Sequence, residues 1–449
     1  MGPQTSDHPE EAAGRPGSRN TGAPGSPDRR VLPSLALVLA IAVVAILVAA
    51  GFMVLFSRLD RLVWAGGGLA SSHPWAVPGL VLLFSLLVGL SQRYLGAPTV
   101  IGGGFVEAIR GDGAPADHRL FPGTLVSSLC SLLSGASIGP EGALAVLVGQ
   151  VSSFVRNRLQ VPEGDAFGFD LAALASAFNG IIGSVLFTGV LATELQPGSR
   201  RHGLEFLVWN LLAGAVGFVI FSLLGFPPFA RSIPFPSLGE LHLAFVPAAV
   251  GCGVIGALLA IGTGACLRST GVAMERLFGD RVVLRALAAG LIVATIGTFF
   301  PDLLFSGEAQ IHGIIADPAR IGVVMLLLMA VLKVLLLGVS FKGGFIGGPL
   351  FPILFSATLV GLAFSLVFPG IPLPLFVLCI QAAAIAVALG APLTAILLVV
   401  VVSPADQETI VLLVISVATA RLLANEVGRR LGHDGETGGE AGVNAGRYP

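Results

Sequence analysis

Charged side chains are scarce in this sequence. Only 11% of its 449 residues are Asp, Glu, Lys or Arg, whereas roughly a quarter of residues are charged in ordinary soluble proteins. Hydrophobic residues make up 54% of the chain, which excludes disorder as its main state. The net charge of −1 offers no basic face for nucleic acid. The composition therefore indicates one large body whose solvent is lipid.

Residue patterns that bind metals or cofactors are also missing. Neither an HExxH zinc motif nor a P-loop occurs in the sequence. The cysteines stand singly in apolar segments and form no CxxC pair: Cys130, Cys252, Cys266 and Cys379. We therefore expect the thiols to behave as small buried hydrophobes, and we expect neither a metal site nor a cofactor.

Long stretches of the chain carry no charge at all. No Asp, Glu, Lys or Arg occurs from Val31 to Ser57, from Leu120 to Pro140, or from Leu171 to Thr193, and a membrane helix needs about 20 apolar residues. The longest such stretch, Gly343 to Ala405, is interrupted by Pro349, Pro352, Pro369, Pro372, Pro374 and Pro392. Broken backbone at membrane depth is tolerated only where protein or a water-filled cavity surrounds it. The sequence predicts a polytopic all-helical membrane protein with interrupted helices.

The two ends of the chain differ from its apolar body. Residues 1–30 are rich in Pro, Gly and Ser and contain Arg15, Arg19, Arg29 and Arg30. Arginines next to the first span favour a cytoplasmic side, and Arg429 and Arg430 favour the same side for the other end. We expect disordered cytoplasmic tails at 1–30 and 426–449, with the body as a multi-pass protein of the cell membrane.

Two pairs of segments resemble each other at nearly constant separation. Ala177–Phe187 aligns with Ala388–Leu398 at an offset of 211 residues, and Gly139-Pro140 aligns with Gly348-Pro349 at an offset of 209. These offsets predict a duplication, with transmembrane halves at 31–230 and 231–425. Repeats of this kind are typical of transporters, which bind substrate near the midplane where the halves meet.

The matched Gly-Pro pairs indicate helix starts inside the membrane. Pro140 fits the first turn of a helix, where a missing N–H costs nothing, and Ser137 is a candidate cap. Gly348-Pro349 also precedes an apolar segment. Two helix N-termini aimed at one place would bind a small inorganic anion without a fixed cation.

Glu141 is the strongest single candidate for a functional residue. An ionisable group within a span costs roughly 3 kcal/mol and is a functional candidate by default. Its carboxylate could occupy the anion site and leave when protonated or displaced, which would make it a gate and a proton carrier. The alternative is a favourable first-turn glutamate near the interface, and the local sequence leaves both interpretations open.

Other polar residues in apolar surroundings are weaker candidates. The run Gly102-Gly103-Gly104 permits close backbone approach to an ion, or is a flexible turn. Glu194 ends an apolar segment and could pass protons, although an interfacial glutamate is commoner. Glu308 stands near His312 in a segment that reads more simply as a polar loop, and Lys333 is expected to snorkel or face a cavity.

One short pattern is typical of enzymes. Gly135-Ala-Ser-Ile-Gly139 matches the GxSxG element of serine hydrolases, with Ser137 as the nucleophile. A hydrolase also needs a positioned histidine, and the candidates lie mostly near loops or charged edges: His73, His118, His202, His242 and His312. We therefore expect no enzyme, with an intramembrane serine hydrolase as a remote alternative.

These segments together resemble the CLC family of chloride channels and chloride–proton antiporters. The family's glycine, GxEGP and GxFxP segments resemble those at Gly102–Val106, Gly139–Ala143 and Gly348–Pro352, and Gly390–Leu397 resembles its late RAPLTG-type segment. The resemblance implies inverted repeats of tilted, broken helices in a homodimer with one pore per subunit. It also implies a gating role for Glu141 and anion contacts at Gly102, Gly103, Gly104, Gly142, Leu350 and Phe351.

The departures from the family pattern concern the ion path. The family's coordinating serine is replaced by Gly103, and Pro349 lacks the N–H used there. The family's late tyrosine has no match, since the only tyrosines are Tyr94 and Tyr448. The internal glutamate of the antiporters corresponds to Leu191, with Glu194 one turn further on. We therefore expect passage of chloride or a related halide, and favour a passive channel over proton-coupled exchange.

Overall fold

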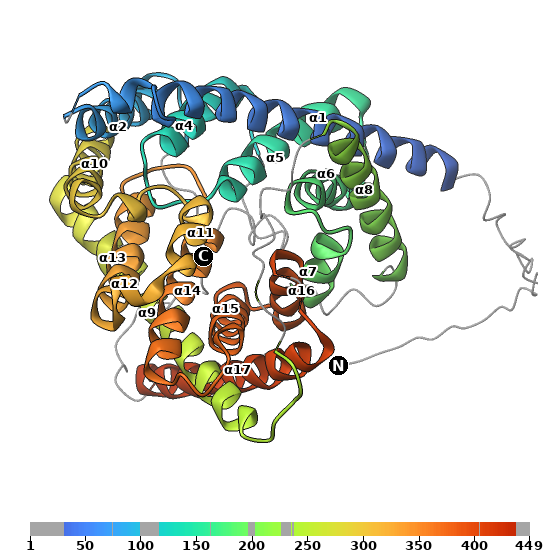
Figure 1. Ribbon diagram of the computed structural model, residues 1–449. Helices are drawn as coiled ribbons and strands as arrows, with labels where there is room; N and C mark the ends of the chain where they lie inside the picture. Colours follow the sequence, from blue (N-terminus) through green and yellow to red (C-terminus); the bar gives the residue numbers. More distant parts are fainter. Residues whose placement is uncertain are drawn as a thin grey trace, which may run out of the picture.

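The computed structural model describes residues 31–73, 75–98, 116–161, 163–195, 203–225, 235, 238–403 and 405–436, and these residues form helices joined by short loops (Figure 1). The first half comprises α1 (Val31–Trp64), α2 (Ala76–Tyr94), α4 (Phe121–Leu133), α5 (Pro140–Leu159), α6 (Glu163–Ile182), α7 (Phe187–Leu195) and α8 (Gly203–Leu223). The second comprises α9 (Phe245–Phe278), α10 (Val282–Phe299), α11 (Glu308–Ala316), α12 (Pro318–Ile321), α13 (Val323–Lys342), α14 (Leu350–Val367), α15 (Leu373–Leu389), α16 (Pro392–Val402) and α17 (Gln407–Glu436). The predicted all-helical class is confirmed.

The order and lengths of the helices recur along the chain. α1 and α9 each have 34 residues, α2 and α10 have 19 and 18, and α5 and α14 have 20 and 18. α1 packs on α6 and α8, and α9 packs in the same way on α15 and α17, while α2 and α10 pack on each other. A duplicated chain would give such a recurrence, and the division into halves at 31–230 and 231–425 stays a prediction.

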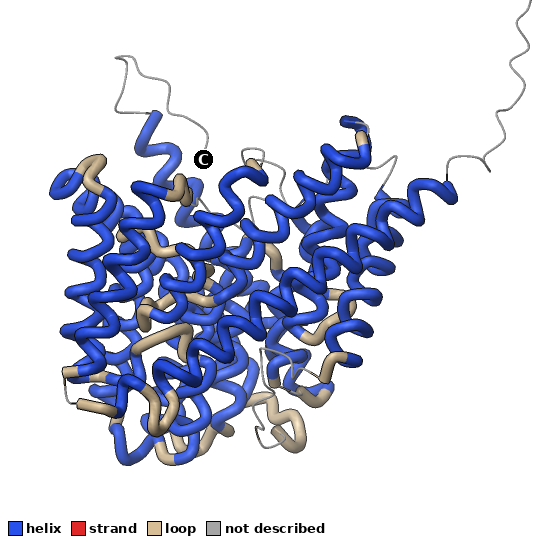
Figure 2. Tube along the Cα trace, turned by 90° about the horizontal axis from the view of Figure 1, so that it is seen from above, coloured by secondary structure: helices blue, strands red, loops and turns tan. Residues whose placement is uncertain are grey.

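Seven of the described helices are long and apolar enough to cross a membrane. One of them, α14, lies inside the protein: 72% of its most apolar window is buried, against 28% to 50% in the other six. α7 and α16 have only 9 and 11 residues, too few to cross a hydrocarbon layer about 30 Å thick at 1.5 Å per residue. Interrupted helices are therefore present, and Figure 2 shows loop segments lying among the helices.

Glycine and proline mark the helix breaks in the second half. Gly390 ends α15 in the left-handed conformation with φ 75°, and Pro392 is in the first turn of α16. A glycine after one helix and a proline at the start of the next are favoured for conformational reasons. The charge-free stretch therefore folds as separate short helices rather than as long spans.

The described structure corrects one predicted boundary. α17 continues to Glu436, whereas a disordered tail is predicted from residue 426. Glu426 forms ion pairs with Arg429 and Arg430, three and four residues later in the helix. Such spacing places opposite charges on one helical face and favours the helix beyond the apolar segment. The predicted tail at 1–30 and the end of the chain from residue 437 lie outside the described residues.

Candidate functional site

The two Gly-Pro segments meet in the middle of the protein. The N–H of Gly139 donates to the carbonyl of Gly348, and the N–H of Gly348 donates to the carbonyl of Gly139, both at 2.8 Å. The pairing is antiparallel, so the two equivalent segments run in opposite directions where they touch. This contact brings the N-terminus of α5 next to that of α14.

Local conformation explains why these helices begin here. Gly139 is extended, with φ −96° and ψ 162°, and Pro140 follows as the first residue of α5. In the other half, Pro349 directly precedes Leu350, the first residue of α14. Proline cannot donate a backbone hydrogen bond, and an early helical position needs none. Ser137, a predicted cap, makes no capping hydrogen bond to α5.

Glu141 extends from the first turn of α5 to the start of α14. Its Oε1 accepts a hydrogen bond of 2.8 Å from the backbone N–H of Leu350, and the amides of Phe351 and of Glu141 itself also face the carboxylate. The residue is only 4% exposed. The carboxylate is therefore an anion held at the positive end of a helix, which is where a free anion would bind.

Glycines make room for this carboxylate. A Cβ built on Gly348 would overlap Glu141 Cγ, Cδ and Oε1, and a Cβ built on Gly139 would overlap Oε2. A Cβ on Gly142 would instead overlap the backbone carbonyl of Gly347. The missing side chains at these positions therefore leave the space that the Glu141 carboxylate occupies between the two helix starts.

We expect Gly142→Ala to destabilise the protein by about 2 kcal/mol, within the range for overpacking. The new methyl group meets backbone that the Gly139–Gly348 hydrogen bonds hold in place, so no side chain can move aside. Unfolding in detergent measures the effect. Gly149→Ala on the same helix is the matched control, because its Cβ lies 3.6 Å from the nearest atom. Equal stability of the two variants would contradict the expectation.

Glu194 lies elsewhere and has different partners. Its carboxylate accepts hydrogen bonds from the backbone N–H of Leu393 at 2.6 Å and from the N–H and hydroxyl of Thr394 at 2.8 and 2.6 Å. It therefore caps the start of α16 from the other half of the chain. Leu191, at the position of the antiporters' internal glutamate, is completely buried.

The hydrolase alternative lacks its partner in the described chain. Ser137 is completely buried; its N–H donates to Ser340 Oγ, and its hydroxyl faces the carbonyl of Lys333 at 3.5 Å. His73, His242 and His312 are exposed, and the ring of His118 packs against Phe154. None of these described histidines contacts Ser137. His202 and the candidates Gly102, Gly103 and Gly104 lie outside the described residues.

The expectation that Lys333 snorkels or faces a cavity is wrong. The side chain has no exposed surface, and its Nζ donates to the carbonyls of Leu303 at 3.0 Å and Phe305 at 2.6 Å. The ammonium also lies 4.8 Å from the ring centroid of Phe355 in α14. Nothing in the local sequence of α13 could reveal these contacts, because the acceptors are 30 and 28 residues away.

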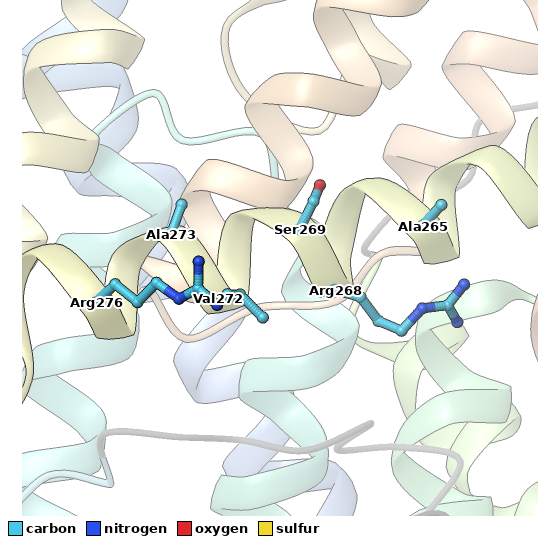
Figure 3. A pocket seen from close by; sticks show the side chains of 6 residues that line it. All are labelled: Ala265, Arg268, Ser269, Val272, Ala273 and Arg276. Atoms are coloured by element: carbon cyan, nitrogen blue, oxygen red, sulfur yellow. The ribbon is translucent and has the colours of Figure 1, made fainter. Parts of the chain in front are cut away.

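A recess on the surface is separate from this centre. It lies along α9 and is lined by Ala265, Arg268, Ser269, Val272, Ala273 and Arg276 (Figure 3). None of these residues belongs to the helix starts described above. The site between α5 and α14 is instead closed, because the carboxylate of Glu141 fills it.

Comparisons with known proteins agree on one family. The sequence matches the family described as "Voltage gated chloride channel" over residues 104–425. It is 26% identical over 358 residues to the "Putative ion-transport protein YfeO" of Escherichia coli O1:K1 / APEC, covering 78% of this chain and 82% of that relative.

Solved structures share the fold. The structure of a "slow cyanobacterial Cl-/H+ antiporter" superposes with a TM-score of 0.73 at 21% identity, covering 88% of this chain and 95% of that one. A "CLC-type fluoride/proton antiporter" superposes with a TM-score of 0.70 at 20% identity and the same coverage. With the matched family region spanning most of the body, this chain belongs to the CLC family of voltage-gated chloride channels.

Proposed function

We propose that this protein exchanges a small inorganic anion, chloride or a related halide, for protons across the membrane, with Glu141 as the gate. One observation carries the proposal: the Glu141 carboxylate accepts the Leu350 N–H at the start of a buried helix. A free anion and this carboxylate would compete for the same amides. An anion therefore passes only when Glu141 leaves.

Protonation weakens the binding of the Glu141 side chain at the start of α14. Oε2 is buried and has no hydrogen-bond partner among the described residues, so a proton can add there without breaking the bond from Leu350 to Oε1. The neutral carboxyl is held less strongly by the helix dipole than the carboxylate. Anion entry and proton uptake are thereby linked at one side chain, and anion flux should rise as the pH falls.

The structural neighbours support exchange over the passive channel that the sequence favours. Two neighbours are described as a Cl-/H+ antiporter and a fluoride/proton antiporter. The passive channel remains the second candidate because of Leu191, which is buried and cannot carry a proton. Glu194 is one turn further on, and its carboxylate accepts hydrogen bonds at the start of α16. A proton route through Glu194 would therefore require these capping hydrogen bonds to break.

The remaining parts of the proposal follow the family. We propose a homodimer with one pore in each subunit, located in the cell membrane with both termini in the cytoplasm, and no enzymatic activity. Lys and Arg near the two ends of the helical body favour that orientation.

Reconstitution into liposomes tests the function directly. With a chloride gradient imposed and no pH gradient, the exchanger moves protons against the direction of chloride flow, and pH is recorded on both sides. Repeating the assay with fluoride, nitrate and bromide ranks the anions. Chloride flux with no proton movement would establish the passive channel instead, and no flux of any anion would contradict both candidates.

A further inference from the structure

A second carboxylate lies near the gate. Glu308 is the first residue of α11, and its Oε2 accepts a hydrogen bond of 2.5 Å from the hydroxyl of Ser306. α11 packs against α14, the helix whose start binds Glu141 (Figure 1). The preceding residue, Gly307, lies directly against the ring of Phe355, because a Cβ built there would be 2.5 Å from that ring.

The loops that carry the two carboxylates are joined. The N–H of Phe305 donates to the carbonyl of Gly135 at 2.9 Å, which links the segment leading to Glu308 with the segment leading to Glu141. The negative charge of Glu141 acts unfavourably on the Glu308 carboxylate. Glu141 is buried and Glu308 is half-buried, and two interacting carboxylates in such surroundings favour a state in which only one of them is ionised.

Lys333 supplies a positive charge near the carboxylate of Glu308. Its ammonium attracts Glu308 and is fixed by the carbonyls of Leu303 and Phe305, one of which belongs to the loop before Glu308. Glu308 is half-buried, and a carboxylate that has lost much of its water is disfavoured unless a cation lies nearby. Lys333 therefore makes ionised Glu308 tolerable after it has given up a proton.

The other charged groups around Glu308 are few in the described structure. On α11 itself, His312 follows one turn later and is exposed. At the start of α12, the capping residue Asp317 and the helix residue Arg320 are exposed, and the backbone N–H of Arg320 donates to the Asp317 carboxylate. On α5 and α13 the facing groups are Glu141 and Lys333. Glu308 thus stands between the gate and a helix surface that reaches solvent.

We infer that Glu308 is a second proton-carrying carboxylate of the exchange cycle, on the loop–helix segment that is bonded to the segment before Glu141, with Lys333 as the nearby cation. The O–H bond of Glu308 breaks when its proton leaves, and a new O–H bond forms at Glu141 Oε2, which has no hydrogen-bond partner among the described residues; because the two carboxylates are not hydrogen-bonded to each other, the transfer requires one of the side chains to move. Glu308 becomes a carboxylate beside the Lys333 ammonium, and it is reprotonated from the solvent side. The inference rests on the proposed proton coupling and supplies a carrier that Leu191 does not provide.

The experiment compares Glu308→Gln with the wild type and with Glu408→Gln in liposomes. Glu408 is also in the first turn of its helix, on α17, which packs on α9, α15 and α16 instead. In Glu308→Gln we expect the protons moved per chloride to fall at least tenfold while chloride flux continues, since a barrier increase of ~1.4 kcal/mol has that effect. We expect Glu408→Gln to keep the wild-type ratio.

Each other outcome has a definite meaning. A wild-type ratio in folded Glu308→Gln overturns the inference and leaves the exchanger intact. Chloride flux without proton movement in the wild type overturns the exchanger and, with it, the proton-carrying role of Glu308. If Glu308→Gln does not fold, Ser306→Ala takes its place: a shifted pH dependence of proton movement supports the inference, and an unchanged one overturns it.

Discussion

Glu141→Gln is expected to abolish proton movement while leaving a path for anions that no longer closes with pH. The amide is isosteric, and its oxygen can still accept from the Leu350 N–H. It carries neither a negative charge nor a transferable proton, so the helix dipole holds it more weakly than a carboxylate. We expect proton flux to fall by at least ~100-fold, in line with the loss of a positioned proton carrier.

Simultaneous recording of pH and chloride efflux from liposomes checks this expectation. Gly149→Ala is the control, because it alters the same helix away from the site. Proton coupling that survives in Glu141→Gln would reduce Glu141 to a helix-start residue. The gate would then have to lie elsewhere, with the segment that contains Gly102, Gly103 and Gly104 as the next candidate.

Lys333→Met is expected to destabilise the protein by about 3 kcal/mol, because two hydrogen bonds from a charged donor are lost, each worth about 1.5–3 kcal/mol. Methionine fills a similar volume but leaves the carbonyls of Leu303 and Phe305 without their donor. It also leaves Glu308 without the ammonium that attracts it. Unfolding in detergent provides the measurement.

Two further variants separate the causes of this effect. Lys342→Met, at the end of the same helix and only half-buried, should change stability by less than ~0.5 kcal/mol, as surface substitutions usually do. Adding Glu308→Gln to Lys333→Met should restore part of the loss, because no unpaired carboxylate then remains. An additive double variant would show that Lys333 and Glu308 do not interact.

Much of the site could be predicted because its signals are local. Gly139-Pro140-Glu141 and Gly348-Pro349 mark helix starts through backbone conformation and a missing N–H. The repeat offset then placed the two starts near each other. The charge-free stretches and their prolines likewise predicted membrane helices with breaks.

The rest depends on contacts between distant segments. Glu194 caps α16 through residues that lie 199 and 200 positions later in the sequence. Lys333 donates to carbonyls of a loop 30 and 28 residues earlier, and nothing in the sequence of α13 indicates that contact. An apolar run with one lysine fits a snorkelling side chain equally well from sequence alone. The helical extension to Glu436 was missed because its ion pairs lie beyond the apolar pattern.

The reciprocal bond between Gly139 and Gly348 is symmetric, but the side chains just beyond the two prolines are not equivalent. At the repeat offset of 209 residues, the position equivalent to Glu141 is Leu350. The Glu141 carboxylate therefore accepts a hydrogen bond from the backbone of its equivalent position, where the side chain is aliphatic and not acidic. Glu194 likewise accepts backbone N–H groups of the other half at the start of α16, although at separations of 199 and 200 residues these are not at its repeat counterpart. The repeated helices thus carry carboxylate contacts that are not repeated, and under the proposed function an ion arriving from one aqueous phase would meet different groups from an ion arriving from the other. Under the proposed function, the difference between the two ends of the ion pathway would come from Glu141 and Glu194 rather than from the helices around them.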